Sequence, residues 1–207
     1  ADGNGTKKSW KVRRLVLRYA AVAAACAALV FGGGYLYSSW KISRFAEQTL
    51  ALSSPAGQTI SVTLQDGTKV WLAGGSTLEY PVVFAGGERR VSVSGEAMFD
   101  VTHRDDNQPF VVSTFAGDVE VLGTKFDVLA EKETGTFSTA LLLGKVRISN
   151  ETEEVVLAPG QIAELRDGRL HTDEMASADD YLWIEGILSL NTPSFTKLAA
   201  RLERIYD

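Results

Sequence analysis

The feature that most constrains this chain is an uncharged apolar run close to its N-terminal end. The run Tyr19–Tyr37 reads YAAVAAACAALVFGGGYLY and has no charged side chain. About 19 residues of helix, at about 1.5 Å each, extend roughly 28 Å, which matches the hydrocarbon core of a bilayer. We therefore predict a transmembrane helix over residues 15–40, which separates a short tail, residues 1–14, from the rest of the chain.

The charges beside this run predict its orientation. Six basic residues come just before it or at its start: Lys7, Lys8, Lys11, Arg13, Arg14 and Arg18. Lysine and arginine stay preferentially on the cytoplasmic side of a membrane. We expect residues 1–14 to be cytoplasmic and everything after the run to lie outside.

Two other interpretations compete with a permanent anchor. A cleaved signal peptide has a shorter apolar core and a site of small residues, whereas here Gly32–Gly34 precedes the bulky segment Tyr35–Tyr37. The triplet before Cys26 faintly resembles a lipoprotein signal, but apolar residues continue past the cysteine. Both comparisons favour the anchor.

Charge and cysteine content limit the functions of the remaining chain. Residues 1–44 carry eight basic side chains and one acidic one, so the net charge of −5 leaves about −12 for residues 45–207. An acidic exterior argues against binding nucleic acid. Beyond Cys26 there is no cysteine, which excludes disulfides and thiolate metal sites there.

The texture of the sequence after the run indicates β-structure. Residues 41–57 have the character of a juxtamembrane stalk. From Gln58 to about residue 175, short apolar–polar alternations are separated by turn residues, and Asp66-Gly67 is a strong hairpin signal. We predict a mainly β domain over 58–175, either a sandwich or jelly roll or, with less support, a β-solenoid.

Residues 176–207 differ again. Ile187–Leu190 is typical of a strand, and Thr192 with Pro193 is typical of a helix start. A strand and one amphipathic helix cannot bury their own apolar face. This segment therefore either packs on the β domain or begins a small α/β domain, and we expect the latter.

Few residues suggest covalent or metal chemistry. The sequence has no G-x-S-x-G, P-loop or dinucleotide motif, so we expect no enzyme of these classes and no cofactor. His103 and His171 fit solvated turns better than metal sites. Arg89-Arg90 is typical of an exposed strand edge. Six aromatic residues are expected in the core: Trp71, Phe84, Phe99, Phe110, Phe115 and Phe126.

From about Leu64 to Asp207 the chain resembles the FecR family of membrane-spanning regulators, in the form common in Bacteroidetes-type bacteria. The order and spacing of many short motifs behind a transmembrane helix carry the resemblance. They are Leu64–Leu72, Ser76–Pro81, Glu88–Val91, Gly95–Val101, Pro109–Val112, Val121–Val128, Leu143–Val146, Leu157–Gln161, Trp183, Gly186 and Leu202–Asp207.

The resemblance implies a signal relay in the bacterial inner membrane with a periplasmic β domain. Family members bind an extracytoplasmic-function sigma factor through a cytoplasmic segment and sense the signalling domain of a TonB-dependent outer-membrane transporter. Only about 14 residues precede the apolar run, so we expect this chain to be the middle portion of such a protein, without the sigma-binding segment. A tethered binding module, for instance for glycan, is the alternative function, and an envelope hydrolase is a third.

The resemblance also singles out the bond between Gly123 and Thr124. Some family members resemble self-cleaving proteins at this Gly-Thr pair. The Thr124 hydroxyl is within reach of the Gly123 carbonyl, and glycine permits the backbone angles that a strained bond requires. The alternative interpretation is a glycine bulge within a strand.

Overall fold

The computed structural model describes residues 19, 26–35, 37 and 48–185. The chain divides into two compact units, Ala1–Phe45 and Ala46–Asp207. The basic residues from Lys7 to Arg18, predicted to set the membrane topology, lie outside the described residues, as do the strand and helix predicted after residue 186. The two units are described separately.

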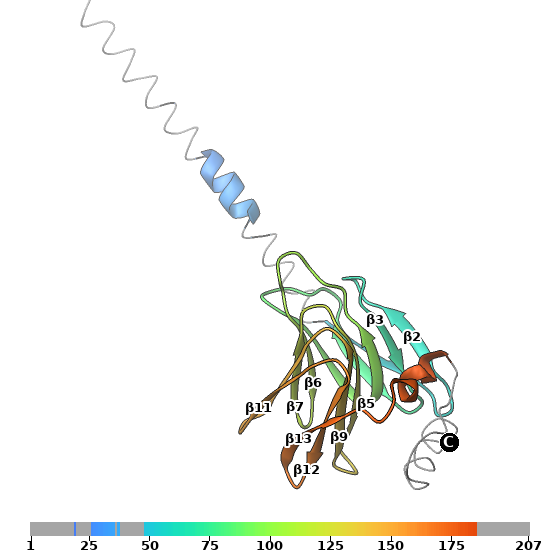
Figure 1. The fold of residues 1–207 in the computed structure, drawn as a ribbon. Helices are drawn as coiled ribbons and strands as arrows, with labels where there is room; N and C mark the ends of the chain where they lie inside the picture. Colours follow the sequence, from blue (N-terminus) through green and yellow to red (C-terminus); the bar gives the residue numbers. More distant parts are fainter. Residues whose placement is uncertain (1–18, 20–25, 36, 38–47, 186–207) are drawn as a thin grey trace, which may run out of the picture. The chain divides into compact units, whose positions relative to one another are not determined.

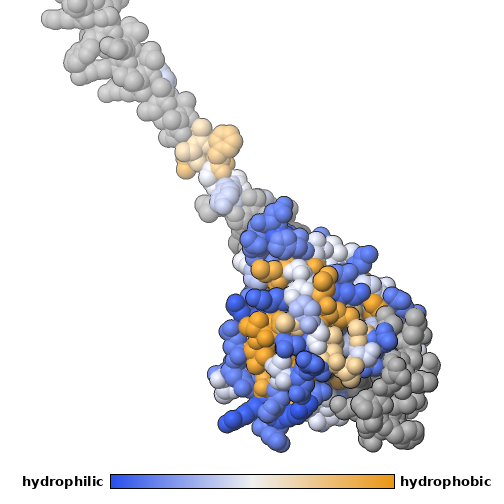
Figure 2. All heavy atoms as spheres, viewed as in Figure 1, coloured by the Kyte–Doolittle hydropathy of each residue, from blue (hydrophilic) through white to orange (hydrophobic). Residues whose placement is uncertain are grey.

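In the first unit, residues 26–35 are helical. Their large apolar side chains are exposed, and Phe31 is 78% exposed. Figure 2 shows apolar atoms at the surface of this segment. Within the described residues, no helix is both long enough and apolar enough to span a bilayer. The transmembrane prediction for 15–40 therefore stays a prediction, because most of that range is not described.

The second unit is a mainly β domain, and its thirteen strands within residues 48–185 form one sheet folded over into two layers (Figure 1). In spatial order the first layer contains β1 (Thr49–Ser53), β4 (Thr77–Pro81), β5 (Arg89–Asp100), β6 (Phe110–Thr114), β7 (Gly117–Val121), β10 (Val146–Ser149) and β11 (Glu154–Leu157). The second contains β2 (Ile60–Thr63), β3 (Lys69–Leu72), β5 again, β8 (Lys125–Glu131), β9 (Thr136–Leu143), β12 (Gln161–Arg166) and β13 (Arg169–Glu174).

Strand β5 belongs to both layers and explains how they are joined. Its first half, Arg89–Ser94, alternates buried and exposed residues and pairs with β4 and with β6, in the one parallel pairing among the described strands. Gly95 has φ +94°, and a Cβ there would lie 2.4 Å from the Ser76 hydroxyl. Only glycine fits this bend, after which Gly95–Asp100 pairs with β8 in the second layer.

The hydrophobic core lies between the two layers. Both contribute fully buried side chains, among them Leu78 and Phe110 from the first layer and Leu72, Phe99 and Phe126 from the second. The rings of Phe99 and Phe126 stack at 5.2 Å. This core confirms the mainly β prediction, in the form of one nearly closed sheet, and the described strands do not form the repeated coils of a solenoid.

Two predictions about the start of this domain have different outcomes. The Asp66-Gly67 hairpin is confirmed: β2 and β3 pair antiparallel across it, and Gly67 has φ +86°. The predicted stalk extends too far, because Thr49–Ser53 forms β1 and pairs with β4. Leu52 supplies the reason, since its side chain packs against the core.

The last described segment, the 3₁₀ helix η1 (Ala178–Glu185), covers the outer face of the second layer. Trp183, 6% exposed, packs in a cluster with Ala73 and the fully buried Met98, and the half-buried Trp71 and Leu142 flank them. This cover explains why the second half of β5 is buried on both faces. Tyr181, Trp183 and Ile184 thus pack on the β domain.

Candidate functional site

The candidate self-cleavage bond lies where the chain crosses from one layer to the other. Strand β7 ends at Val121 in the first layer, and β8 begins at Lys125 in the second. The chain crosses back through Gly144 and Lys145, between β9 and β10. The Gly123–Thr124 bond therefore lies in a connection and not in a strand bulge, and a register irregularity follows it at Lys125/Phe126.

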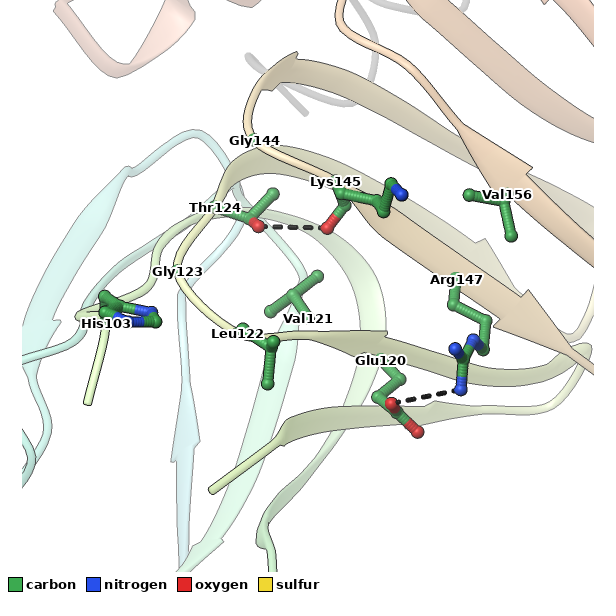
Figure 3. Close-up of a pocket in the computed structure, with 10 residues that line it drawn as sticks. All are labelled: His103, Glu120, Val121, Leu122, Gly123, Thr124, Gly144, Lys145, Arg147 and Val156. Atoms are coloured by element: carbon green, nitrogen blue, oxygen red, sulfur yellow. Dashed lines mark hydrogen bonds and ion pairs between the residues drawn. The ribbon is translucent and has the colours of Figure 1, made fainter. Parts of the chain in front are cut away.

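The two crossovers are in direct contact. The Thr124 hydroxyl donates a hydrogen bond to the Lys145 carbonyl at 3.0 Å, and Thr124 is only 4% exposed (Figure 3). A Cβ on Gly144 would lie 2.8 Å from the Thr124 hydroxyl oxygen and 2.9 Å from the Gly123 carbonyl oxygen. The attacking and the attacked groups of a self-cleavage reaction thus lie on the same side of the connection, against Gly144.

Hydrogen bonds hold the connection on both sides of the bond. The Thr124 carbonyl accepts a hydrogen bond from the Val101 N–H at 3.0 Å. The Leu122 carbonyl accepts one from Arg89 at 3.3 Å. These two contacts restrict how the Gly123–Thr124 peptide can turn.

His103 lies directly beside Gly123, as Figure 3 shows. A Cβ on Gly123 would lie 2.6 Å from the His103 Cβ, so any larger residue at position 123 would push the histidine away. Sequence reasoning placed His103 in a solvated turn, and it is indeed exposed. The reasoning missed its contact with Gly123, because twenty residues separate the two and no local pattern links them.

A cavity of about 340 Å³ opens onto this bond. Val121, Leu122 and Val156 supply its apolar lining, while Lys145, Arg147 and Glu120 supply charges. Arg147 is 3.5 Å from both Glu120 and Glu154, in exposed pairs. The cavity brings water or a small molecule within reach of the Gly123–Thr124 peptide.

The turn that carries His103 has its own electrostatic arrangement. Arg104 donates a hydrogen bond to Asp106 at 3.0 Å, and the Gln108 N–H donates another at 3.2 Å. The hydrogen bond from Arg104, followed by the one from Gln108, lowers the pKa of the Asp106 carboxyl from its ordinary value. No group of three or more potential metal ligands occurs among the residues that the structure describes.

The expectation for Arg89-Arg90 is half wrong. Arg90 is exposed and pairs with Glu88 and Asp118, both at 2.7 Å. Arg89 is fully buried and pairs with Asp66 at 2.7 Å. Alternation along β5 places adjacent side chains on opposite faces, so one arginine meets solvent and the other enters the domain.

Comparison with known proteins gives a consistent picture. A family model described as FecR protein matches residues 51–147. A solved chain from Parabacteroides distasonis ATCC 8503, described as a candidate anti-sigma factor, is 30% identical with a TM-score of 0.70, over 77% of this chain and 75% of that chain. A second solved chain with the same description and source has 30% identity, a TM-score of 0.69 and coverages of 75% and 74%. The curated proteins contain no match.

Proposed function

Because this chain belongs to the FecR family, we propose that it regulates an extracytoplasmic-function sigma factor. The observation that carries the proposal is the shared β domain: two solved chains described as candidate anti-sigma factors match it over about three quarters of their length. The described residues contribute the domain that senses the signal. In this proposal, sigma binding takes place on the cytoplasmic side of the membrane.

In the proposed arrangement the chain relays the state of a TonB-dependent outer-membrane transporter. The apolar run anchors it in the inner membrane with the basic tail in the cytoplasm. The β domain and residues 186–207 then lie in the periplasm, where the signalling domain of the transporter is the partner. The acidic surface of the domain favours a protein partner over nucleic acid.

A pull-down with a purified transporter signalling domain tests the relay. The full chain in detergent should retain the signalling domain, and a sigma-dependent reporter in cells should respond to removal of the chain. Titration with envelope glycans is the competing arm. Saturable glycan binding without retention of the signalling domain would replace the relay with a binding module.

We further propose that the Gly123–Thr124 bond cleaves itself. The Thr124 Oγ attacks the Gly123 carbonyl carbon, and water in the adjoining cavity takes up the hydroxyl proton. The C–N bond breaks, the Thr124 nitrogen takes up a proton to become an amine, and an ester joins Gly123 to the Thr124 oxygen. Water then hydrolyses the ester, leaving a carboxylate on Gly123 and a free hydroxyl on Thr124. The proximity of both oxygen atoms to Gly144 and the buried setting of Thr124 support this chemistry.

Denaturing gels of a fresh preparation test self-cleavage. The wild-type chain should give two fragments that meet at Gly123/Thr124, identified by mass, and Thr124→Ala should give one intact band. Thr139→Ala is the matched control, since Thr139 is equally buried but distant in sequence from the bond. A single intact wild-type band that Thr124→Ala leaves unchanged would end the proposal.

A further inference from the structure

Arg89 makes an unusual set of contacts for a buried charge. Its side chain is 0% exposed and its guanidinium lies 5.4 Å from the centre of the Phe110 ring. One nitrogen, Nη1, donates to the Asp66 carboxylate at 2.7 Å and to the Thr102 carbonyl at 2.9 Å. The other, Nη2, donates to the Gln108 carbonyl at 2.9 Å and to the Leu122 carbonyl at 3.3 Å.

These four acceptors come from three separate connections at one end of the domain. Asp66 belongs to the turn between β2 and β3, and Thr102 and Gln108 belong to the connection between β5 and β6. Leu122 belongs to the crossover that contains the candidate bond. A single planar group therefore donates hydrogen bonds to three segments at once, beside the direct bond from the Val101 N–H to the Thr124 carbonyl.

Two of the four acceptors lie next to residues of the candidate cleavage site. Thr102 immediately precedes His103, and Leu122 immediately precedes Gly123. Because one guanidinium holds both preceding carbonyls, it also sets the approach of His103 to Gly123, where a Cβ would have only 2.6 Å of room. Resting on the proposed self-cleavage, we propose that Arg89, oriented by Asp66, is a positioning residue for the Gly123–Thr124 bond.

A contribution to folding stability alone explains the buried Arg89–Asp66 ion pair less well than a positioning role. A buried ion pair is often no more stabilising than apolar residues of the same size, so its presence is poor evidence for a purely structural role. What an apolar side chain cannot supply is a fixed fork of donors. Lysine cannot supply it either, because its ammonium is a single point on a flexible stem.

The test compares self-cleavage rates of variants in the full chain in detergent. Arg89→Lys keeps the charge beside Asp66 but cannot reach the carbonyls on both sides, so the rate should fall about tenfold or more. Arg90→Lys is the matched control on the exposed face, and its rate should stay within about twofold. Asp66→Glu, which keeps the carboxylate but displaces the guanidinium, is the second variant should Arg89→Lys fail to fold.

A stability-matched variant separates positioning from general structure. Val91→Ala removes core volume from the same strand but leaves the four hydrogen bonds of Arg89 in place. At an equal loss of unfolding free energy, Arg89→Lys should cleave more slowly than wild type, whereas Val91→Ala should cleave at the wild-type rate. Equal slowing of the two, or an Arg89→Lys rate within twofold of wild type, would overturn the positioning role while self-cleavage stands. A wild-type chain that never cleaves would remove both.

Discussion

Gly144 and Thr124 are packed so closely that a Cβ at position 144 would lie 2.8 Å from the Thr124 hydroxyl oxygen. This contact joins the two places where the chain crosses between the layers. Gly144 also has φ +98°, a backbone conformation that residues other than glycine rarely adopt.

Substitution of Gly144 should therefore be costly for two reasons that a control can separate. Gly135 has φ +69° but open space where a Cβ would stand. Gly135→Ala should lower the unfolding free energy by about 1 kcal/mol through backbone strain alone. Gly144→Ala should cost a further 1–3 kcal/mol or so, because Thr124 has to move. Urea unfolding measures both, and equal losses would show that the contact is unimportant.

Breaking the buried ion pair between Arg89 and Asp66 should cost much more unfolding free energy than breaking the exposed pair between Arg90 and Asp118. Asp66→Asn leaves a fully buried guanidinium without its counter-ion and should cost about 3–5 kcal/mol of unfolding free energy. Asp118→Asn removes a partner of the exposed Arg90 and should cost less than about 1 kcal/mol. Chemical denaturation of the two variants checks this, and similar losses would contradict the burial of Arg89.

Trp183 should hold η1 on the outer face of the second layer. Trp183→Ala exposes Met98 and should destabilise the domain by about 3 kcal/mol. Phe115→Ala, at a site already 39% exposed, is the control and should cost far less. Increased binding of an apolar fluorescent dye by Trp183→Ala alone would report the uncovered patch. Unchanged dye binding would mean that other residues cover it.

Self-cleavage should not separate the two halves of the chain. Cleavage after Gly123 leaves β1–β7 in one fragment and β8–β13 in the other. Strands β5 and β8 still pair over six positions, β7 and β10 over three, and the core is shared. The fragments should elute together in native chromatography and separate only in denaturant. Separation under native conditions would contradict the interlocked layers.

The stability of the turn that carries His103 should decrease at acidic pH. The hydrogen bonds from Arg104 and Gln108 depress the pKa of Asp106, so their stabilising effect is complete above the unfolded value of about 3.9 and is lost as pH falls through the lower folded value. Carbon NMR of the Asp106 carboxyl measures that pKa. Arg104→Gln should raise the pKa of Asp106. An unchanged pKa would mean that the Arg104–Asp106 hydrogen bond does not form in solution.

Individual residues show which features of the fold and the site the sequence pattern could predict. The Asp-Gly turn and the alternation after Gln58 predicted a β domain, because hairpin geometry and strand period are local properties of the chain. Gly123 and Thr124 also stood out in the sequence. Arg89 was misjudged, since adjacent positions on a strand face opposite ways and the pattern of two arginines does not say which one enters the domain.

The amino-acid order by itself determined that residues after 58 form short strands and that the run before residue 38 is apolar, since both follow from periodicity and side-chain type. Tertiary structure alone decided that β1 joins the sheet, that Trp183 covers Met98 and that Arg89 holds the carbonyls beside His103 and Gly123. These relationships join residues 13 or more positions apart in sequence. They arise only when the folded layers bring such segments to within a few ångströms of one another.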